Sequence, residues 1–301
     1  KKLEADKKNK NFDIPVNEIE SVILTHAHLD HTGRLPLMAK NGYENPIYST
    51  PATHDLATIV MDDSAKIQMK EATPKSKGAT PKVPLYIDKD ANKAAKLMKT
   101  IPYNVEKKIA DDLILQFYNA GHILGSAFAS VTVTDKTVPG FFGKIFGKKE
   151  TSKDVNILFT GDLGRPNRSI IKEPDVNVGK PDYIVMESTY GNRKHENLNV
   201  GIEQLEKIIN ETVANNGKVI IPCFALERCQ EIILYLRRLY EAKKIPKRVP
   251  IYLDSPMSIN ATQIFTLHQE AYNDEMKKEF LDKGKDPFCF SQLFFVNKIQ
   301  E

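Results

Sequence analysis

The chain has 301 residues, of which 41% are hydrophobic and 27% charged, and its formal net charge is +4. This apolar fraction excludes persistent disorder, and the length suffices for one large or two medium domains with a buried core. The charge is too weakly positive to indicate a nucleic-acid partner by itself.

No segment predicts membrane insertion or export. The apolar runs fall short of the roughly 18 to 20 residues that a membrane-spanning helix needs. Residues 1–13 lack the apolar centre and the cleavage site of a signal peptide. Cys223, Cys229 and Cys289 cannot form a disulfide framework, and none has CxxC spacing. We therefore expect a cytoplasmic protein that is not held in a membrane.

In the first hundred residues, strand and helix patterns alternate. The run EIESVILT at 18–25 predicts a short strand, because β-branched and apolar residues gather at its end. Next come a predicted helix over 34–40, a strand over 46–51, and helices over 52–71 and 91–99. The stretch 72–90 is rich in Lys, Pro and Thr and predicts an irregular loop.

The following ninety residues have mainly strand patterns. Strands are predicted between 105 and 134, over 155–162 and over 181–189, and a glycine-punctuated basic hairpin over 135–154. After Tyr190 the pattern alternates again, with helices at 196–214, 225–241 and from 256, and strands at 218–225 and 249–254. Such alternation predicts parallel β/α units. We therefore place a domain boundary near residue 190.

A dense group of potential metal ligands follows the first predicted strand. His26, His28, Asp30 and His31 lie within six residues. Side chains two residues apart on an extended backbone point the same way, so His26 and His28 can converge on one ion. Zinc accepts imidazole and carboxylate ligands, and two metal ions can share them. The alternative is a polar loop with solvated histidines, which would leave this density of ligands without a use.

Two further polar residues stand at the ends of later strands. His122 lies in NAGHILGSA and Asp162 in LFTGDLGR, and glycines beside both allow sharp turns. Taken alone, His122 is more typical of a buried core histidine, and Asp162 of a turn or helix cap. Their position after apolar strands favours a common site with the first histidine group.

These segments resemble a known family. THAHLDHTG, GHILGSA and TGDLGR resemble successive metal motifs of the metallo-β-lactamase superfamily. ESTYGNRKHE, PCFALERCQEII and PIYLDSPMSINAT resemble its β-CASP nucleases, in particular RNA-processing enzymes similar to the endonuclease of the cleavage and polyadenylation specificity factor and its prokaryotic counterparts. The motifs occur in the family's order between about residues 18 and 275.

The resemblance implies an α/β fold in which a metallo-β-lactamase αββα sandwich carries an inserted β-CASP domain of parallel strands and helices. The expected domains are residues 1–190 and 191–301. Both are expected to be incomplete, because two strands and an aspartate motif before residue 18, and two histidines after the helical region, are missing from the family's pattern. We expect an internal fragment of a longer enzyme, with weak or absent turnover by this chain alone.

The resemblance also implies roles for single residues. The implied ligands are His26, His28 and His122 for a first zinc, Asp30 and His31 for a second, and Asp162 as a bridge between the two ions. Asp30 would also orient or deprotonate the attacking water. Glu187 matches an acidic residue that hydrogen-bonds a catalytic histidine further along, and glutamate here is typical of the RNA-processing branch. His195 matches a position near the cleft mouth and is a candidate substrate contact.

The implied activity is zinc-dependent hydrolysis of single-stranded RNA by an endoribonuclease, through a metal-activated hydroxide. The alternatives are an additional 5′-exonuclease activity, a DNA nuclease or small-ester hydrolase on the same scaffold, or a non-enzymatic RNA-processing subunit. A homo-oligomer or an RNA-processing complex is an open alternative to a monomer. Basic side chains could track phosphates, although we favour solvated or helix-end roles for them: Arg237, Arg238, Lys243, Lys244, Lys247 and Arg248, and the hairpin lysines Lys144, Lys148 and Lys149.

Overall fold

The computed structural model describes residues 8–73, 82–136, 152–193 and 198–296. The chain divides into two compact units, the first formed by Lys1–Pro166 and Glu173–Glu187, the second by Asn167–Lys172 and Ser188–Glu301. The excursion of residues 167–172 into the second unit was not predicted, and the assignment of the two expected domains stays a prediction. In the described ranges, no helix combines the length and apolarity needed to cross a bilayer.

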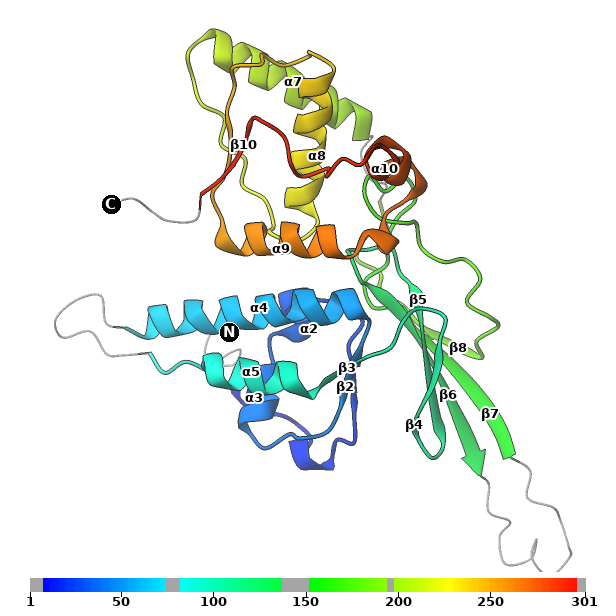
Figure 1. Cartoon of the computed structure of the whole chain (residues 1–301). Coiled ribbons are helices and arrows are strands. Elements are labelled where there is room, and N and C mark those ends of the chain that lie inside the picture. The colour runs from blue at the N-terminus through cyan, green and yellow to red at the C-terminus, as the bar shows by residue number, and fades with distance from the viewer. Residues whose placement is uncertain (1–7, 74–81, 137–151, 194–197, 297–301) are drawn as a thin grey trace, which may run out of the picture. The chain divides into compact units, whose positions relative to one another are not determined.

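The first unit begins with a small parallel sheet and its helices. Strands β1 (Val22–Ile23), β2 (Ile47–Ser49) and β3 (Met98–Thr100) pair in the order β1-β2-β3. The helices are α2 (Leu29–Thr32), α3 (Leu35–Lys40), α4 (Pro51–Ala72) and α5 (Asp88–Leu97), after the 3-10 turn η1 (Val16–Glu18). Figure 1 shows α3, α4 and α5 grouped to one side of β2 and β3. The helix predicted over 52–71 is confirmed, whereas the strand predicted over 18–25 is limited to its centre.

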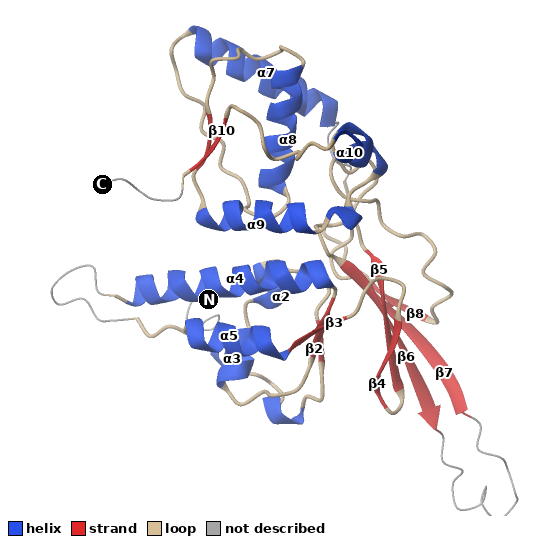
Figure 2. Ribbon diagram, viewed as in Figure 1, coloured by secondary structure: helices blue, strands red, loops and turns tan. Residues whose placement is uncertain are grey.

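A five-stranded sheet completes this unit (Figure 2). Its strands are β4 (Glu106–Ala110), β5 (Leu113–Asn119), β6 (Ala127–Lys136), β7 (Ser152–Phe159) and β8 (Tyr183–Val185), in sequence order. Neighbours are antiparallel except β7 and β8, which are parallel. The centre of the predicted hairpin, with Lys144, Lys148 and Lys149, lies outside the described residues, as does the middle of the loop predicted over 72–90.

The two sheets enclose an apolar core in the first unit. Leu115 and Phe117, two residues apart on β5, point to the same face and are fully buried. Ile23 of β1 and Tyr48 of β2 pack against the cluster that contains them. The small sheet therefore packs face to face with the large one and has helices on its other side, as in the predicted sandwich.

The second unit is built mainly from helices. They are α7 (Leu198–Ala214), α8 (Arg228–Glu241), α9 (Pro256–Leu267) and α10 (Asp274–Glu279), with 3-10 turns η2 (Gln269–Ala271) and η3 (Leu281–Lys283). Strands β9 (Ile251–Leu253) and β10 (Leu293–Phe295) form a parallel pair. Ile209 of α7 packs with Leu236 and Leu239 of α8 in the unit's core.

Two segments of this unit differ from the prediction. Residues 218–225, predicted as a strand, form no ladder with any described residue, and Ile220 is 88% and Phe224 83% exposed. A strand needs a neighbour for its N–H and C=O groups, and a local pattern does not specify that neighbour. Conversely, the tail predicted as helical from 256 contains β10, which pairs with β9.

The excursion 167–172 is firmly packed into the second unit. The Arg168 guanidinium lies 3.0 Å from Glu227 and 3.7 Å from Glu231, and all three side chains are buried. Ile171 forms an antiparallel bridge with Tyr272. Glu227 has φ +64° and ψ −57°, and the Arg228 N–H donates to the Leu226 carbonyl at 2.7 Å, which is a strained γ-turn.

Candidate metal centre

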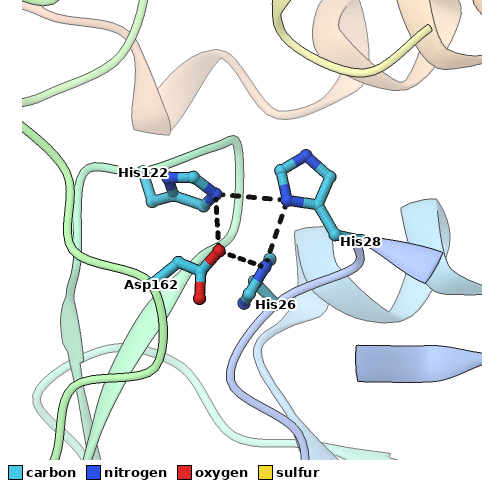
Figure 3. A group of neighbouring side chains, drawn as sticks. All are labelled: His26, His28, His122 and Asp162. Carbon is cyan, nitrogen blue, oxygen red and sulfur yellow. Dashed lines mark hydrogen bonds and ion pairs between the residues drawn. The ribbon is translucent and has the colours of Figure 1, made fainter. Parts of the chain in front are cut away.

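Loops at the ends of three strands carry four of the six predicted ligands, and α2 carries Asp30 and His31. His26 and His28 follow β1, and His28 is the N-cap of the short helix α2. His122 lies in the turn between β5 and β6, and Asp162 follows β7. Figure 3 shows the four side chains directed toward one point. The sheet topology thus gathers residues that lie 136 positions apart in the sequence.

The distances within this group suit one small cation. His28 Nδ1 lies 3.1 Å from His26 Nε2 and 3.1 Å from His122 Nε2. Asp162 Oδ2 lies 3.5 Å from His122 Nε2 and 3.7 Å from His26 Nε2. One ligand atom from each residue lies within 4.8 Å of the other three. A tetrahedron with zinc–ligand bonds of roughly 2.0–2.2 Å has edges of about 3.3–3.6 Å, so the donor set fits zinc in size and chemistry.

Burial favours the ligating form of the first histidine. His26 is 1% exposed. Its burial, and then the neighbouring His31, lower the pKa of His26 from 6.5 to about 2. Burial also lowers the pKa of His28, against the opposing charges of Asp30 and Asp162. Neutral imidazoles keep a nitrogen lone pair for a metal, so these two rings can ligate at neutral pH.

His31 lies near the other oxygen of the Asp162 carboxylate, and Asp30 lies next to His31. His31 Nε2 is 3.4 Å from Asp162 Oδ1 and 3.6 Å from Asp30 Oδ2. Burial raises the pKa of Asp162, while the nearby His31 acts in the opposite direction. The Asp30 side chain is 78% exposed. The structure therefore brings both residues next to the four-residue group, although their role as ligands stays a prediction.

Glu187 supports the Asp162 loop in a way that was not predicted. Its Oε1 accepts a hydrogen bond of 2.7 Å from the backbone N–H of Leu163, the residue after Asp162. The family role, a hydrogen bond to a later histidine, stays a prediction. His195 lies outside the described residues.

Two glycines allow the ligand loops to approach closely. Gly161, next to Asp162, has φ +52°, and a Cβ there would lie 2.7 Å from Thr25 Oγ1. A Cβ on Gly164 would lie only 2.1 Å from the carbonyl oxygen of Gly121. The Gly164 N–H also donates to the Ala120 carbonyl at 2.9 Å. The loops of His122 and Asp162 are therefore in direct backbone contact.

Sequence reasoning missed the residue that shapes the His122 turn. The Ser126 hydroxyl accepts hydrogen bonds from the backbone N–H groups of His122 at 3.0 Å and Ile123 at 3.2 Å. Ser126 is fully buried. A serine four residues after the histidine was the available signal, because serine hydroxyls commonly bond to nearby backbone groups.

Several of the basic residues considered for phosphate binding have structural partners. Arg237 is buried, pairs with Glu241 and stacks on Phe280. Arg238 pairs with Glu275 and Glu279 on α10, and Lys244 pairs with Glu206 on α7. Exposed, by contrast, are Lys243, Lys247 and Arg248. Ion pairs within the second unit, rather than the expected solvated or helix-end roles, therefore account for Arg237, Arg238 and Lys244.

Two family models match the chain. The metallo-beta-lactamase superfamily domain matches residues 1–138. The Beta-Casp domain matches residues 229–301. The first match contains five of the six predicted ligands and ends before the sixth, Asp162.

Curated relatives match over nearly the whole chain. Transcription termination factor FttA of Methanosarcina mazei is 35% identical over 288 residues, which cover 93% of this chain and 40% of the relative. Ribonuclease TTHA0252 of Thermus thermophilus is 32% identical over 277 residues, covering 92% and 56%. The FttA of Pyrococcus horikoshii is 32% identical over 281 residues, covering 92% and 38%. The chain thus spans between 38% and 56% of the length of these relatives.

Proposed function

Because the chain belongs to the β-CASP group of the metallo-β-lactamase superfamily, we propose that the protein is a zinc-dependent phosphodiester hydrolase that cleaves single-stranded RNA. The observation that carries this proposal is the convergence of three imidazoles and one carboxylate within 4.8 Å. A relative of 32% identity is a ribonuclease by name, which supports RNA as the substrate. Glu187, the residue typical of the RNA-processing branch, supports the same choice.

The ligands for a first ion are His26, His28, His122 and Asp162. When bound, zinc supplies Lewis-acid chemistry and makes water a nucleophile at neutral pH. The buried His26 ring remains neutral, so it presents a lone pair rather than a repelling charge. Asp30, exposed beside His31, is the proposed base that orients the attacking water and accepts its proton at the carboxylate.

A second zinc is proposed between Asp30, His31 and Asp162. The support is that the two oxygens of the Asp162 carboxylate face different histidines. Oδ1 faces His31, whereas Oδ2 faces His26 and His122. A carboxylate arranged in this way can bridge two cations, which is one way in which two-metal sites are built. His195 as a substrate contact and a cytoplasmic location remain part of the proposal.

The alternatives differ in substrate, in mode of cleavage or in whether the protein is an enzyme. A DNA nuclease and a small-ester hydrolase could use the same ligands, and an added 5′-exonuclease activity needs no change in them. A non-enzymatic subunit, alone or in an RNA-processing complex, is disfavoured because all six predicted ligand positions carry suitable residues.

The test measures zinc content and cleavage together. Wild type and Asp162→Asn are incubated with single-stranded RNA and DNA oligonucleotides of one sequence, with and without a chelator. Asp111→Asn, on a side chain that is 97% exposed, is the control. We expect zinc-dependent RNA cleavage that is lost only in Asp162→Asn. Cleavage that survives complete removal of zinc would refute the proposal. Weak turnover is expected of the 301-residue chain, so zinc content and cleavage are scored separately.

A further inference from the structure

His122 is held by a turn rather than by a strand or helix. The turn closes on itself, because the Ser126 N–H donates to the Ile123 carbonyl at 2.9 Å and the Ala120 N–H donates to the Ser126 carbonyl at 3.0 Å. These bonds define the turn's shape but leave its position relative to the other ligand loops open. That position requires contacts from outside the turn.

The start of α4 supplies such contacts. The hydroxyls of Thr50 and Thr53 both donate to the carbonyl oxygen of Gly125, at 2.6 and 2.7 Å. Both threonines are fully buried. Gly125 has φ +82°, and a Cβ there would lie 2.4 Å from the backbone nitrogen of Thr53. The backbone of the turn therefore lies directly against the first turn of α4.

The two hydroxyls differ in what else they do. Thr50 is the N-cap of α4, and its Oγ1 also accepts a hydrogen bond of 3.2 Å from the Thr53 N–H. The Thr53 hydroxyl has the Gly125 carbonyl as its hydrogen-bond partner. A change at Thr53 therefore tests the attachment of the turn without removing the helix cap.

We propose that Thr50 and Thr53 are positioning residues for His122, because they hold the turn at which its imidazole meets His28 and Asp162. The inference rests on the proposed metal centre. Ligand distances in metal sites are held to about 0.2 Å, so a small shift of the Gly125 carbonyl weakens ligation by His122. Partners outside the ligand set typically contribute 10–100-fold to metal affinity.

The experiment compares two variants of Thr53 in the 301-residue chain, prepared without metal. Thr53→Val removes the hydroxyl and keeps the shape, whereas Thr53→Ser keeps the hydroxyl. Thr262→Val is the control, because the Thr262 hydroxyl is buried in the second unit and donates to the Ser258 carbonyl at 2.7 Å. Zinc affinity is measured by chelator competition, and backbone hydrogen exchange is measured at His122 and Ile123.

We expect Thr53→Val to lower zinc affinity by about 10-fold or more, and Thr53→Ser and Thr262→Val to stay within about threefold of wild type. The amides of His122 and Ile123 should exchange faster in Thr53→Val alone. Equal zinc affinity in Thr53→Val and wild type, or equal losses in the Val and Ser variants, would overturn the proposal. If wild type binds no zinc, the proposed function fails, and the exchange rates alone decide whether the threonines hold the turn.

Discussion

The two oxygens of Asp162 face different histidines: Oδ2 lies 3.7 Å from His26 Nε2, and Oδ1 lies 3.4 Å from His31 Nε2. The rings of these histidines are also close, with centroids 4.0 Å apart. A single carboxylate thus lies near both a buried histidine and a partly exposed one. This relationship makes Asp162 the residue on which both proposed ions depend.

Replacing Asp162 with Asn should reduce zinc binding at both positions. The amide keeps the size of the side chain but loses the negative charge that balances the cations. We expect the affinity for the first zinc to fall at least about 100-fold. This loss exceeds the usual one for a residue that only supports a ligand, because Asp162 is itself a proposed ligand. Equilibrium dialysis against buffered zinc gives the affinity and the number of ions bound. Retention of two ions in Asp162→Asn would contradict the bridging role.

A methyl group on Gly164 should separate the loops of His122 and Asp162. Its Cβ would lie 2.1 Å from the Gly121 carbonyl oxygen, and neither partner is a flexible side chain. We expect Gly164→Ala to lower zinc affinity by about 10-fold or more. Gly201→Ala is the control, because a Cβ at that position of α7 meets no atom within 4 Å. Chelator competition on both variants separates the backbone clash from a general effect of the substitution.

The metal-free chain should lose stability in mild acid through His26. Its folded-state pKa is about 2 and its reference value is 6.5, so between these values the unfolded chain binds a proton at His26 that the folded chain does not. The contribution of His26 to the free energy of unfolding is therefore fully present above pH 6.5. It falls as the pH decreases, by about 1.4 kcal/mol per pH unit. Urea unfolding of the metal-free chain at pH 7, 6 and 5, followed by circular dichroism, measures the slope.

His26→Gln should remove this contribution to the slope. His54→Gln is a suitable control, because His54 lies on α4 and pairs with Asp55 away from the four-residue group. An unchanged pH dependence in His26→Gln would show that burial of this ring does not destabilise the folded chain in acid.

The buried ion pair between Arg168 and Glu227 should stabilise the second unit. In Glu227→Gln the Arg168 charge loses its nearest carboxylate and keeps Glu231 at 3.7 Å. Breaking a buried pair by removing one partner costs about 3–5 kcal/mol, whereas an exposed pair contributes less than about 1 kcal/mol. Hydrogen exchange of α8 amides should therefore accelerate strongly in Glu227→Gln and little in Glu211→Gln, which alters the exposed pair with Lys207. Similar exchange in both variants would contradict this.

The sequence was most informative where local pattern decides structure. Helix α4 has an N-cap threonine and a proline at its first position, which mark its start without any tertiary contact. The apolar strand before His26 and the glycines around His122 and Asp162 were likewise visible. The ligand atoms of His26, His28, His122 and Asp162 lie within 4.8 Å of one another because the fold brings the ends of their strands together.

Features that depend on distant neighbours were not predictable from local pattern. Residues 218–225 have strand composition but no described ladder partner, and β10 pairs with a strand 42 residues earlier. The hydrogen bonds from Thr53 to Gly125 join positions 72 residues apart. No periodicity encodes such a contact, because it depends on how two loops approach in space.

The excursion 167–172 has a practical consequence for dividing the protein. The chain enters the second unit at Asn167, returns at Glu173 and leaves the first unit again after Glu187. A piece cut near residue 188 would lack the fully buried Ile170 and the guanidinium that neutralises Glu227. Cleavage at that junction would also leave residues 167–172, which belong to the second unit, covalently attached only to the first. Expressing the second unit alone therefore calls for grafting the hexapeptide back, as a designed fusion or as an added synthetic peptide.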